Sequence, residues 1–143
     1  MKIKFSVCLI FILIGFEVNL LSFLSIIVDS ITVGPFQENT FILWEKELRS
    51  ALLIDPGDDP DEIISKIRTL DLVPFAIINT HAHADHVGAV SKIKDEFSIP
   101  FYLHKDEKQI LEHYPEICRM LGIQSYEIPT VDYWISGDGE MEF

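Results

Sequence analysis

Three histidines and an aspartate, His81, His83, Asp85 and His86, lie within six residues of the stretch NTHAHADHVGAV at 79–90. In an extended chain, residues two apart point the same way, so the imidazoles of His81 and His83 can converge on one ion. The next two side chains can turn toward a neighbouring point. Imidazole nitrogen and carboxylate oxygen both bind Zn²⁺, at about 2.0–2.2 Å. The spacing therefore predicts two half-sites for metal, side by side.

A simpler interpretation exists for each of these residues alone. Asp85 can serve as the N-cap of a following helix, and a single histidine is more often a hydrogen-bonded polar group than a ligand. Four such residues at a junction between a strand and a helix favour metal ligation, because loops at strand ends carry functional side chains to the rim of a sheet.

The elements before this cluster are predicted to be three strands and a helix. The stretches 29–35, 39–45 and 50–57 are rich in β-branched and aromatic residues and end at turn residues. A helix then begins with Asp59 as N-cap and Pro60 at its first position. Its apolar stripe, at helical spacing, is Ile63, Ile64, Ile67 and Leu70.

The remaining elements continue the alternation. A buried strand at 74–79 precedes the cluster, and an amphipathic helix with the stripe Val87, Val90, Ile93 and Phe97 follows it. A strand at 99–104 and a helix from 106, interrupted at Pro115 and ending before Gly122, come next. Strands that alternate with helices predict an α/β fold.

The motif and its surroundings resemble a known family. THAHADH at 80–86 matches the H-x-H-x-D-H signature of the metallo-β-lactamase-fold hydrolases. VGPFQENTFIL at 33–43, LLIDPGD at 52–58 and IPFYLHKDE at 99–107 are similar to segments of its glyoxalase II-like branch. The resemblance extends from about residue 26 to the C-terminus.

The resemblance implies a fold, a cofactor and a reaction. The fold is an αββα sandwich with two metal ions, usually zinc, at one edge. His81 and His83 would belong to the first metal, and Asp85 and His86 to the second. The implied reaction is hydrolysis of a thioester such as S-D-lactoylglutathione by a metal-bound hydroxide, with Asp85 also orienting the nucleophile.

The family's remaining ligands have no counterpart in this sequence. A third histidine comes from a later "GHT"-type turn, a bridging aspartate follows, and a last histidine completes the second metal. The other imidazoles after the leader, His104 and His113, match neither position, and a catalytic zinc ordinarily needs three protein ligands. We therefore expect residues 26–143 to be a partial domain, truncated after its N-terminal half. Such a domain would be inactive alone and would leave an apolar sheet face uncovered.

Two alternatives remain open. The chain can be one part of a split enzyme, with a complementing chain that supplies the missing ligands. It can also be a non-catalytic metal-binding or membrane-associated half-domain.

The first 25 residues form an apolar leader. The run from Phe5 to Phe16 after two lysines resembles a secretory signal, while residues 5–28 are long enough to contact or cross a membrane. The leader can also be extraneous to the working protein. Localisation is therefore open: cytoplasmic if the leader is extraneous, membrane-anchored or exported if it is real.

Charge and cysteine content limit the partners. The chain has a formal charge of −12, and from Asp29 on it carries 9 basic and 22 acidic side chains. Such a surface repels phosphate backbones, so we expect no nucleic acid partner. The expected substrate, a small-molecule thioester or ester, is what the family resemblance implies. Cys8 and Cys118 have no partner at metal-ligand spacing, so both are expected to be bystander thiols.

Overall fold

The structure is a computed structural model that describes residues 2–3, 25–137 and 140–141. The chain divides into two units: residues 24–135, and residues 1–23 together with 136–143. In the smaller unit, β1 (Lys2–Ile3) pairs in parallel with β8 (Glu140–Met141). Most of the predicted apolar leader lies outside the described residues. Within the described parts, no helix is both long and apolar enough to span a bilayer.

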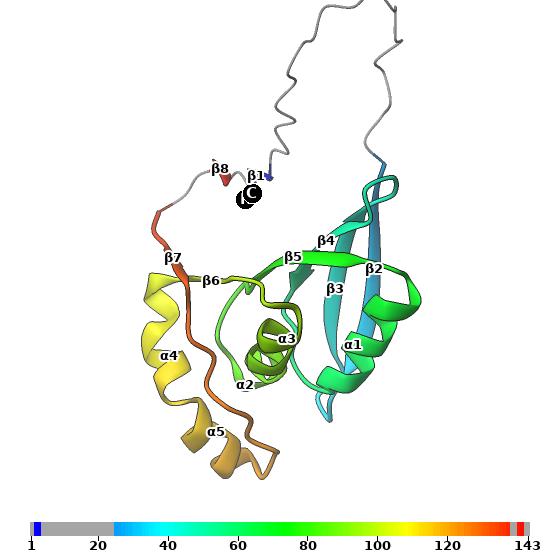
Figure 1. The fold of residues 1–143 in the computed structure, drawn as a ribbon. Coiled ribbons are helices and arrows are strands. Elements are labelled where there is room, and N and C mark those ends of the chain that lie inside the picture. The colour runs from blue at the N-terminus through cyan, green and yellow to red at the C-terminus, as the bar shows by residue number, and fades with distance from the viewer. Residues whose placement is uncertain (1, 4–24, 138–139, 142–143) are drawn as a thin grey trace, which may run out of the picture. The chain divides into compact units, whose positions relative to one another are not determined.

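The larger unit contains a six-stranded sheet in the order β2-β3-β4-β5-β6-β7 (Figure 1). The first two pairings are antiparallel and the remaining three are parallel. The strands are β2 (Ile26–Val33), β3 (Glu38–Glu45), β4 (Ser50–Ile54), β5 (Val73–Ile78), β6 (Phe101–His104) and β7 (Tyr133–Ile135). The predicted α/β class is confirmed.

Helices connect the parallel strands. Figure 1 shows α1 and α3 on the same face of the sheet, where they contact each other. The helices are α1 (Pro60–Thr69), α2 (Ala84–Val87), α3 (Val90–Phe97), the 3-10 turn η1 (Lys105–Glu107), α4 (Lys108–Glu112) and α5 (Tyr114–Leu121). The helical connection between parallel strands is the usual one, because such strands need a crossover.

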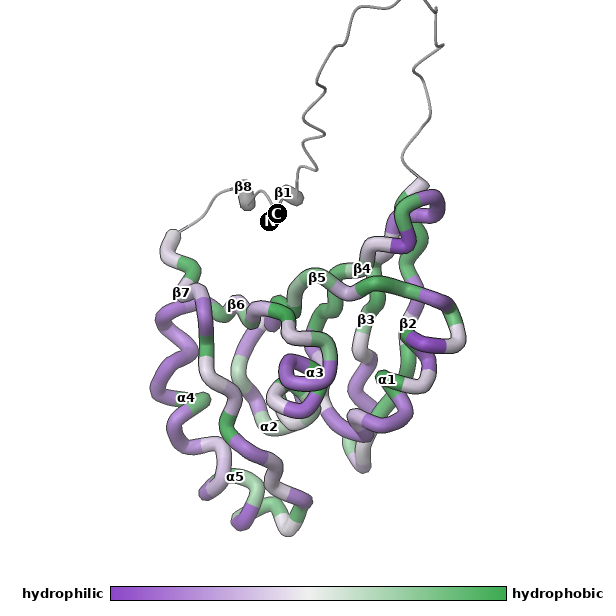
Figure 2. The backbone as a smooth tube through the Cα atoms, viewed as in Figure 1, coloured by the Kyte–Doolittle hydropathy of each residue, from purple (hydrophilic) through white to green (hydrophobic). Residues whose placement is uncertain are grey.

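The core lies between these helices and the sheet. The stripe residues of both helices are buried, except Leu70 and Phe97, which are partly buried. Burying each aliphatic side chain stabilises the fold by about 1.5–3 kcal/mol. Figure 2 shows hydrophobic colour on the central strands and on the inner side of α1. The strand residues of this core include Ile42, Leu53, Ile77, Phe101 and Leu103.

The other face of the sheet is open only in part. Val28 and Phe41, near the β2 edge, are 61% and 41% exposed. On the central strands of the same face, Leu52 and Ile78 are buried, at 0% and 3% exposed. Among the described residues, the predicted apolar face is therefore uncovered only in part.

Several predicted boundaries shift in the structure. The helix after the motif is two helices, α2 and α3, separated at Gly88 and Ala89. The Asp59 side chain does not cap α1; its carboxylate accepts a hydrogen bond from the Gly34 amide at 2.8 Å. Pro115 lies in the first turn of α5, and Gly122 ends that helix in the left-handed region, at φ 67°. Proline fits a first turn because its missing N–H has no partner there in any helix.

Candidate metal centre

The carboxyl ends of parallel strands place the candidate residues together. β4, β5 and β6 run in the same direction, so the segments that follow them meet at one edge of the sheet. Asp55 follows β4, the loop 79–83 follows β5, and Glu107 ends the 3-10 turn after β6.

His81 and His83, the first pair, face one another across this edge. His81 Nε2 lies 3.0 Å from His83 Nδ1, and the two rings meet edge to face at 81°. Two nitrogens that bind one zinc at about 2.0–2.1 Å lie about 3.3 Å apart in tetrahedral geometry. The two ring nitrogens thus lie at hydrogen-bond distance, slightly closer than two ligands of one zinc would be.

Asp85 and His86, the second pair, lie in the first turn of α2. The Asp85 Oδ2 atom is 3.7 Å from His86 Nε2, and the ring of His86 lies 4.0 Å from that of His81. The two pairs are thus adjacent, as the sequence predicts. The alternative role of Asp85 as N-cap is wrong, because the N-cap position belongs to His83 and Asp85 is inside the helix.

Asp55 orients the first pair through Thr80. The Thr80 amide and hydroxyl donate to Oδ1 and Oδ2 of Asp55 at 2.7 and 2.6 Å, and the same hydroxyl lies 2.9 Å from His81 Nδ1. A hydroxyl has one proton. Thr80 gives that proton to Asp55, so the Thr80 oxygen can only accept a hydrogen bond from His81. The ring proton of His81 is therefore on Nδ1. His81 Nε2 is then the unprotonated nitrogen, and it faces His83 Nδ1.

Asp55 also faces the second pair. Its Oδ2 lies 3.3 Å from His86 Nδ1, a buried nitrogen that makes no hydrogen bond in the structure. Asp55, His81 and His86 together offer three ligand atoms within 4.8 Å of one another. Both Asp55 oxygens already accept from Thr80, so the geometry favours Asp55 as a support of the histidines over direct coordination. Carboxylates commonly hold metal-ligating histidines in this way.

The electrostatics of the site favour a cation. Burial raises the pKa of Glu38 to about 8, with further increases from the Asp55 and Asp85 carboxylates. Burial and the neighbouring His86 and His83 rings lower the pKa of His81, which favours its neutral form. A neutral imidazole can bind a metal ion, and a cation nearby would offset the repulsion between these acidic groups.

Two glycines bring the second pair against the loop 55–59. A Cβ on Gly57 would lie 1.9 Å from the Asp85 carbonyl oxygen, and one on Gly88 would lie 2.3 Å from the Gly57 carbonyl oxygen. Only glycine allows this approach of the two backbones. The position of α2, and with it the Asp85 side chain, is therefore fixed by direct backbone packing.

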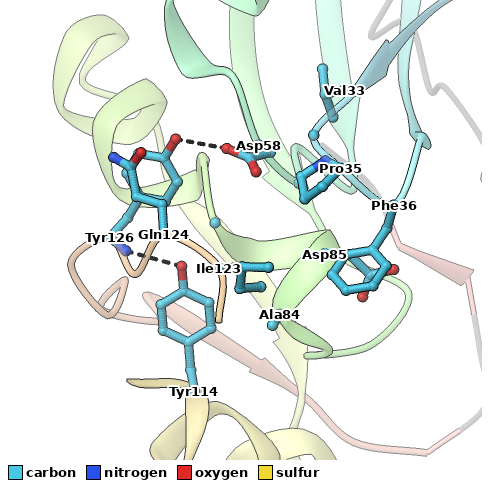
Figure 3. Close-up of a pocket in the computed structure, with 13 residues that line it drawn as sticks. Val33, Pro35, Phe36, Asp58, Ala84, Asp85, Tyr114, Ile123, Gln124 and Tyr126 are labelled. Atoms are coloured by element: carbon cyan, nitrogen blue, oxygen red, sulfur yellow. Dashed lines mark hydrogen bonds between the residues drawn. The ribbon is translucent and has the colours of Figure 1, made fainter. Parts of the chain in front are cut away.

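A narrow cavity lies beside Asp85, shown in Figure 3. The Tyr126 hydroxyl donates to Asp58 Oδ1 at 2.6 Å, and the Tyr126 amide donates to the Tyr114 hydroxyl at 3.1 Å. Burial raises the pKa of both tyrosines, so both remain protonated. These bonds tie the segment after α5 to the loop that packs on the second pair.

The two other histidines of the described chain lie apart from both pairs. His104 Nδ1 accepts from the Asp106 amide at 3.3 Å, and His113 Nδ1 contacts the Gln109 carbonyl at 2.7 Å. Neither joins the cluster, in agreement with the sequence prediction.

Asp55, Glu38, Thr80 and Glu107 were not predicted as site residues. Asp55 carried a usable signal, a carboxylate directly after a buried strand, at the edge where the motif loop also begins. Glu38 carried none, because it lies inside β3, far from the motif in sequence.

Comparison with known proteins identifies the family. Residues 33–142 match the model of the metallo-beta-lactamase superfamily, which is more than half of the chain. The chain belongs to this superfamily.

Curated relatives include enzymes of the glyoxalase II type. Hydroxyacylglutathione hydrolase GloC of Haemophilus influenzae is 31% identical over 80% of this chain and 54% of its own length. The probable metallo-hydrolase YqgX of Bacillus subtilis is 37% identical over 76% of this chain and 51% of its own length. The chain thus spans about half the length of these relatives.

Two solved structures share the fold. The BLEG-1 B3 metallo-beta-lactamase matches with a TM-score of 0.71 at 34% identity, over 78% of this chain and 54% of that one. TTHA1623 in a di-iron-bound form matches with a TM-score of 0.70 at 35% identity, over 78% of this chain and 55% of that one. The superfamily implies a divalent metal, and the donor set of the two pairs fits one.

Proposed function

We propose that this chain carries the metal-binding part of a hydrolase that acts on thioesters of the hydroxyacylglutathione type. The relatives named hydroxyacylglutathione hydrolase support the substrate class. The observation that carries the proposal is the 3.0 Å approach of His81 Nε2 and His83 Nδ1, with the second pair beside it.

His81 and His83 would hold one metal, and Asp85 and His86 a second. When bound, such ions supply a hydroxide at neutral pH and polarise a carbonyl. Asp55 holds the ring of His81 in the tautomer that exposes Nε2. The Asp85 carboxylate is the group that can also orient the attacking nucleophile, so it is the proposed catalytic residue.

The metal is proposed to be zinc, because two imidazoles and a carboxylate are usual zinc ligands. Iron is the competing metal, since TTHA1623 was crystallised in a di-iron-bound form. Elemental analysis of the purified chain after growth with equal zinc and iron distinguishes the two.

A non-catalytic metal-binding role is the second candidate. Each pair supplies two ligands from the described residues, whereas a catalytic zinc ordinarily has three. A polypeptide of these 143 residues alone is therefore expected to bind fewer than two zinc ions tightly. We expect it to hydrolyse S-D-lactoylglutathione no faster than its His81→Ala, His83→Ala variant.

A fusion separates the two candidates. Residues 26–143 are joined to the second half of the Haemophilus influenzae hydroxyacylglutathione hydrolase, which serves as a complementing segment, and thioester hydrolysis is measured. The hydrolase proposal predicts turnover at least about 100-fold above the same fusion with His81→Ala, His83→Ala, since oriented metal-bound hydroxide supplies several kcal/mol. A folded, metal-loaded fusion that leaves the thioester intact would contradict it.

A further inference from the structure

Glu107 touches the motif loop at one defined point. Its Oε2 accepts a hydrogen bond from the Ala82 amide at 3.0 Å. Ala82 is the residue between the two histidines of the first pair, and its side chain is fully buried. We propose that Glu107 is a positioning residue that fixes the spacing of His81 and His83; this inference rests on the proposed metal site.

The bond from Ala82 to Glu107 matters because the loop 79–83 has few backbone hydrogen bonds of its own. Residues 79–83 belong to no helix or strand. The Asn79 amide still bonds the Tyr102 carbonyl of β6 at 3.2 Å, but the amides of Thr80 and Ala82 are held by side chains. The Thr80 amide is held by Asp55 at 2.7 Å, and the Ala82 amide by Glu107 at 3.0 Å. These two carboxylates come from the ends of β4 and β6, on either side of β5 in the sheet. The loop is thus held from both neighbouring strands.

The hydrogen bonds that Asp55 and Glu107 accept from the loop determine where the imidazoles of His81 and His83 point. Alternate residues of an extended segment point to the same side, so a fixed Ala82 amide keeps both flanking imidazoles directed to one side, toward the proposed metal position. Without Glu107, the Ala82 amide would lose its acceptor beside a fully buried side chain. The loop would then turn to find another acceptor, and the 3.0 Å separation of the two ring nitrogens would change.

The position of Glu107 also offers a matched control. Asp106 precedes it in η1, carries the same charge, and has a side chain that is 74% exposed. It contacts His104, which lies outside both pairs. Asp106→Ala therefore removes the same charge from the same turn without touching the loop.

The test compares Glu107→Ala, Glu107→Gln and Asp106→Ala in the full chain. The first measurement is hydrogen exchange of the Ala82 amide in metal-free protein. We expect exchange at least about 10-fold faster in Glu107→Ala and near the parent rate in the other two, because glutamine still offers an acceptor oxygen. The second is Co²⁺ affinity and its visible spectrum, with a loss of about 10–100-fold for Glu107→Ala, the usual effect of a lost supporting partner.

Each result decides the inference. An Ala82 amide that exchanges equally in the parent and Glu107→Ala overturns it, as does an equal Co²⁺ loss in Asp106→Ala, which would indicate a charge effect. Equal Co²⁺ loss in Glu107→Gln and Glu107→Ala also overturns it. If the parent chain binds no Co²⁺, the proposed metal site fails, while the exchange rates still show whether Glu107 holds the loop.

Discussion

The two pairs of candidate ligands are built in different ways. The first pair lies in an irregular loop, where extended backbone brings residues two apart to one point. The second pair lies in the first turn of α2, where consecutive side chains diverge, and Asp85 Oδ2 lies 3.7 Å from His86 Nε2. The loop needs hydrogen bonds from neighbouring strands to keep its shape. The helix has its own backbone hydrogen bonds, and its position depends on close packing against the backbone of Gly57.

Asp55 is common to both pairs. It reaches His81 through the Thr80 hydroxyl and lies 3.3 Å from His86 Nδ1. The difference between the pairs is therefore one of local support, while a single carboxylate couples their orientation. Substitutions of the ligands, of the shared carboxylate Asp55 and of Gly57, which supports the second pair, should therefore affect the two pairs differently.

Removal of ligands should have the largest effect. His81→Ala with His83→Ala, or Asp85→Ala with His86→Ala, leaves one pair alone. We expect Co²⁺ affinity to fall by more than about 100-fold, because loss of a supporting partner already costs 10–100-fold. Titration followed by visible absorption measures it. His104→Ala with His113→Ala serves as control, and a similar loss there would remove the distinction between cluster and surface histidines.

Asp55→Asn should weaken both pairs. Its amide nitrogen would face the Thr80 hydroxyl, which would then donate to His81 Nδ1 and move the ring proton to Nε2. We expect about a 10–100-fold loss of Co²⁺ affinity, and the ring nitrogen chemical shifts of His81 should report the changed tautomer. Asp58→Asn is the control, because that carboxylate bonds Tyr126 and not Thr80. An unchanged His81 tautomer in Asp55→Asn would contradict the interpretation that Asp55 sets this tautomer through Thr80.

Gly57→Ala should affect the second pair more than the first. The added methyl would meet the Asp85 carbonyl oxygen at 1.9 Å, so the backbone must move, at a cost of about 1–3 kcal/mol. Thermal unfolding measures the loss, and backbone chemical shifts should change at Asp85 and less at His83. Gly122→Ala, which meets no atom within 4 Å but strains a left-handed backbone, separates general destabilisation from displacement of α2. Equal shifts at both pairs would show that the loop and helix move as one.

Asp132→Asn should have the smallest effect and none on the pairs. Burial by itself would raise the pKa of Asp132, but hydrogen bonds from Lys94 and the Phe101 amide outweigh it, and the folded pKa lies below 3.8. A lowered carboxyl pKa stabilises the fold above the unfolded pKa and is lost as the pH falls through the folded value. We expect a loss of about 0.5–1 kcal/mol at pH 7 that shrinks below about pH 4.

Urea unfolding of Asp132→Asn at pH 7 and pH 3 checks this pH dependence. Asp61→Asn, at a largely exposed ion pair with Lys92, should change little. A loss of stability in Asp132→Asn that grows as the pH falls would contradict the lowered pKa of Asp132.

Local sequence signals predicted most of the elements. The apolar stripes of α1 and α3 and the turn residues around the strands gave the order of elements, because burial periodicity and backbone restrictions act over a few residues. The same signals predicted one continuous helix where the structure has α2 and α3, since the break between them lies at Gly88, which packs against the loop at Gly57.

The sequence by itself determined that His81, His83, Asp85 and His86 are metal-ligand types at ligand spacing. That information is local, because the four residues lie within six positions. The tertiary structure decided which distant groups hold them. Asp55 and Glu107 are each about 25 residues from the loop positions they bond, and only the parallel order of β4, β5 and β6 brings their carboxylates to one edge of the sheet.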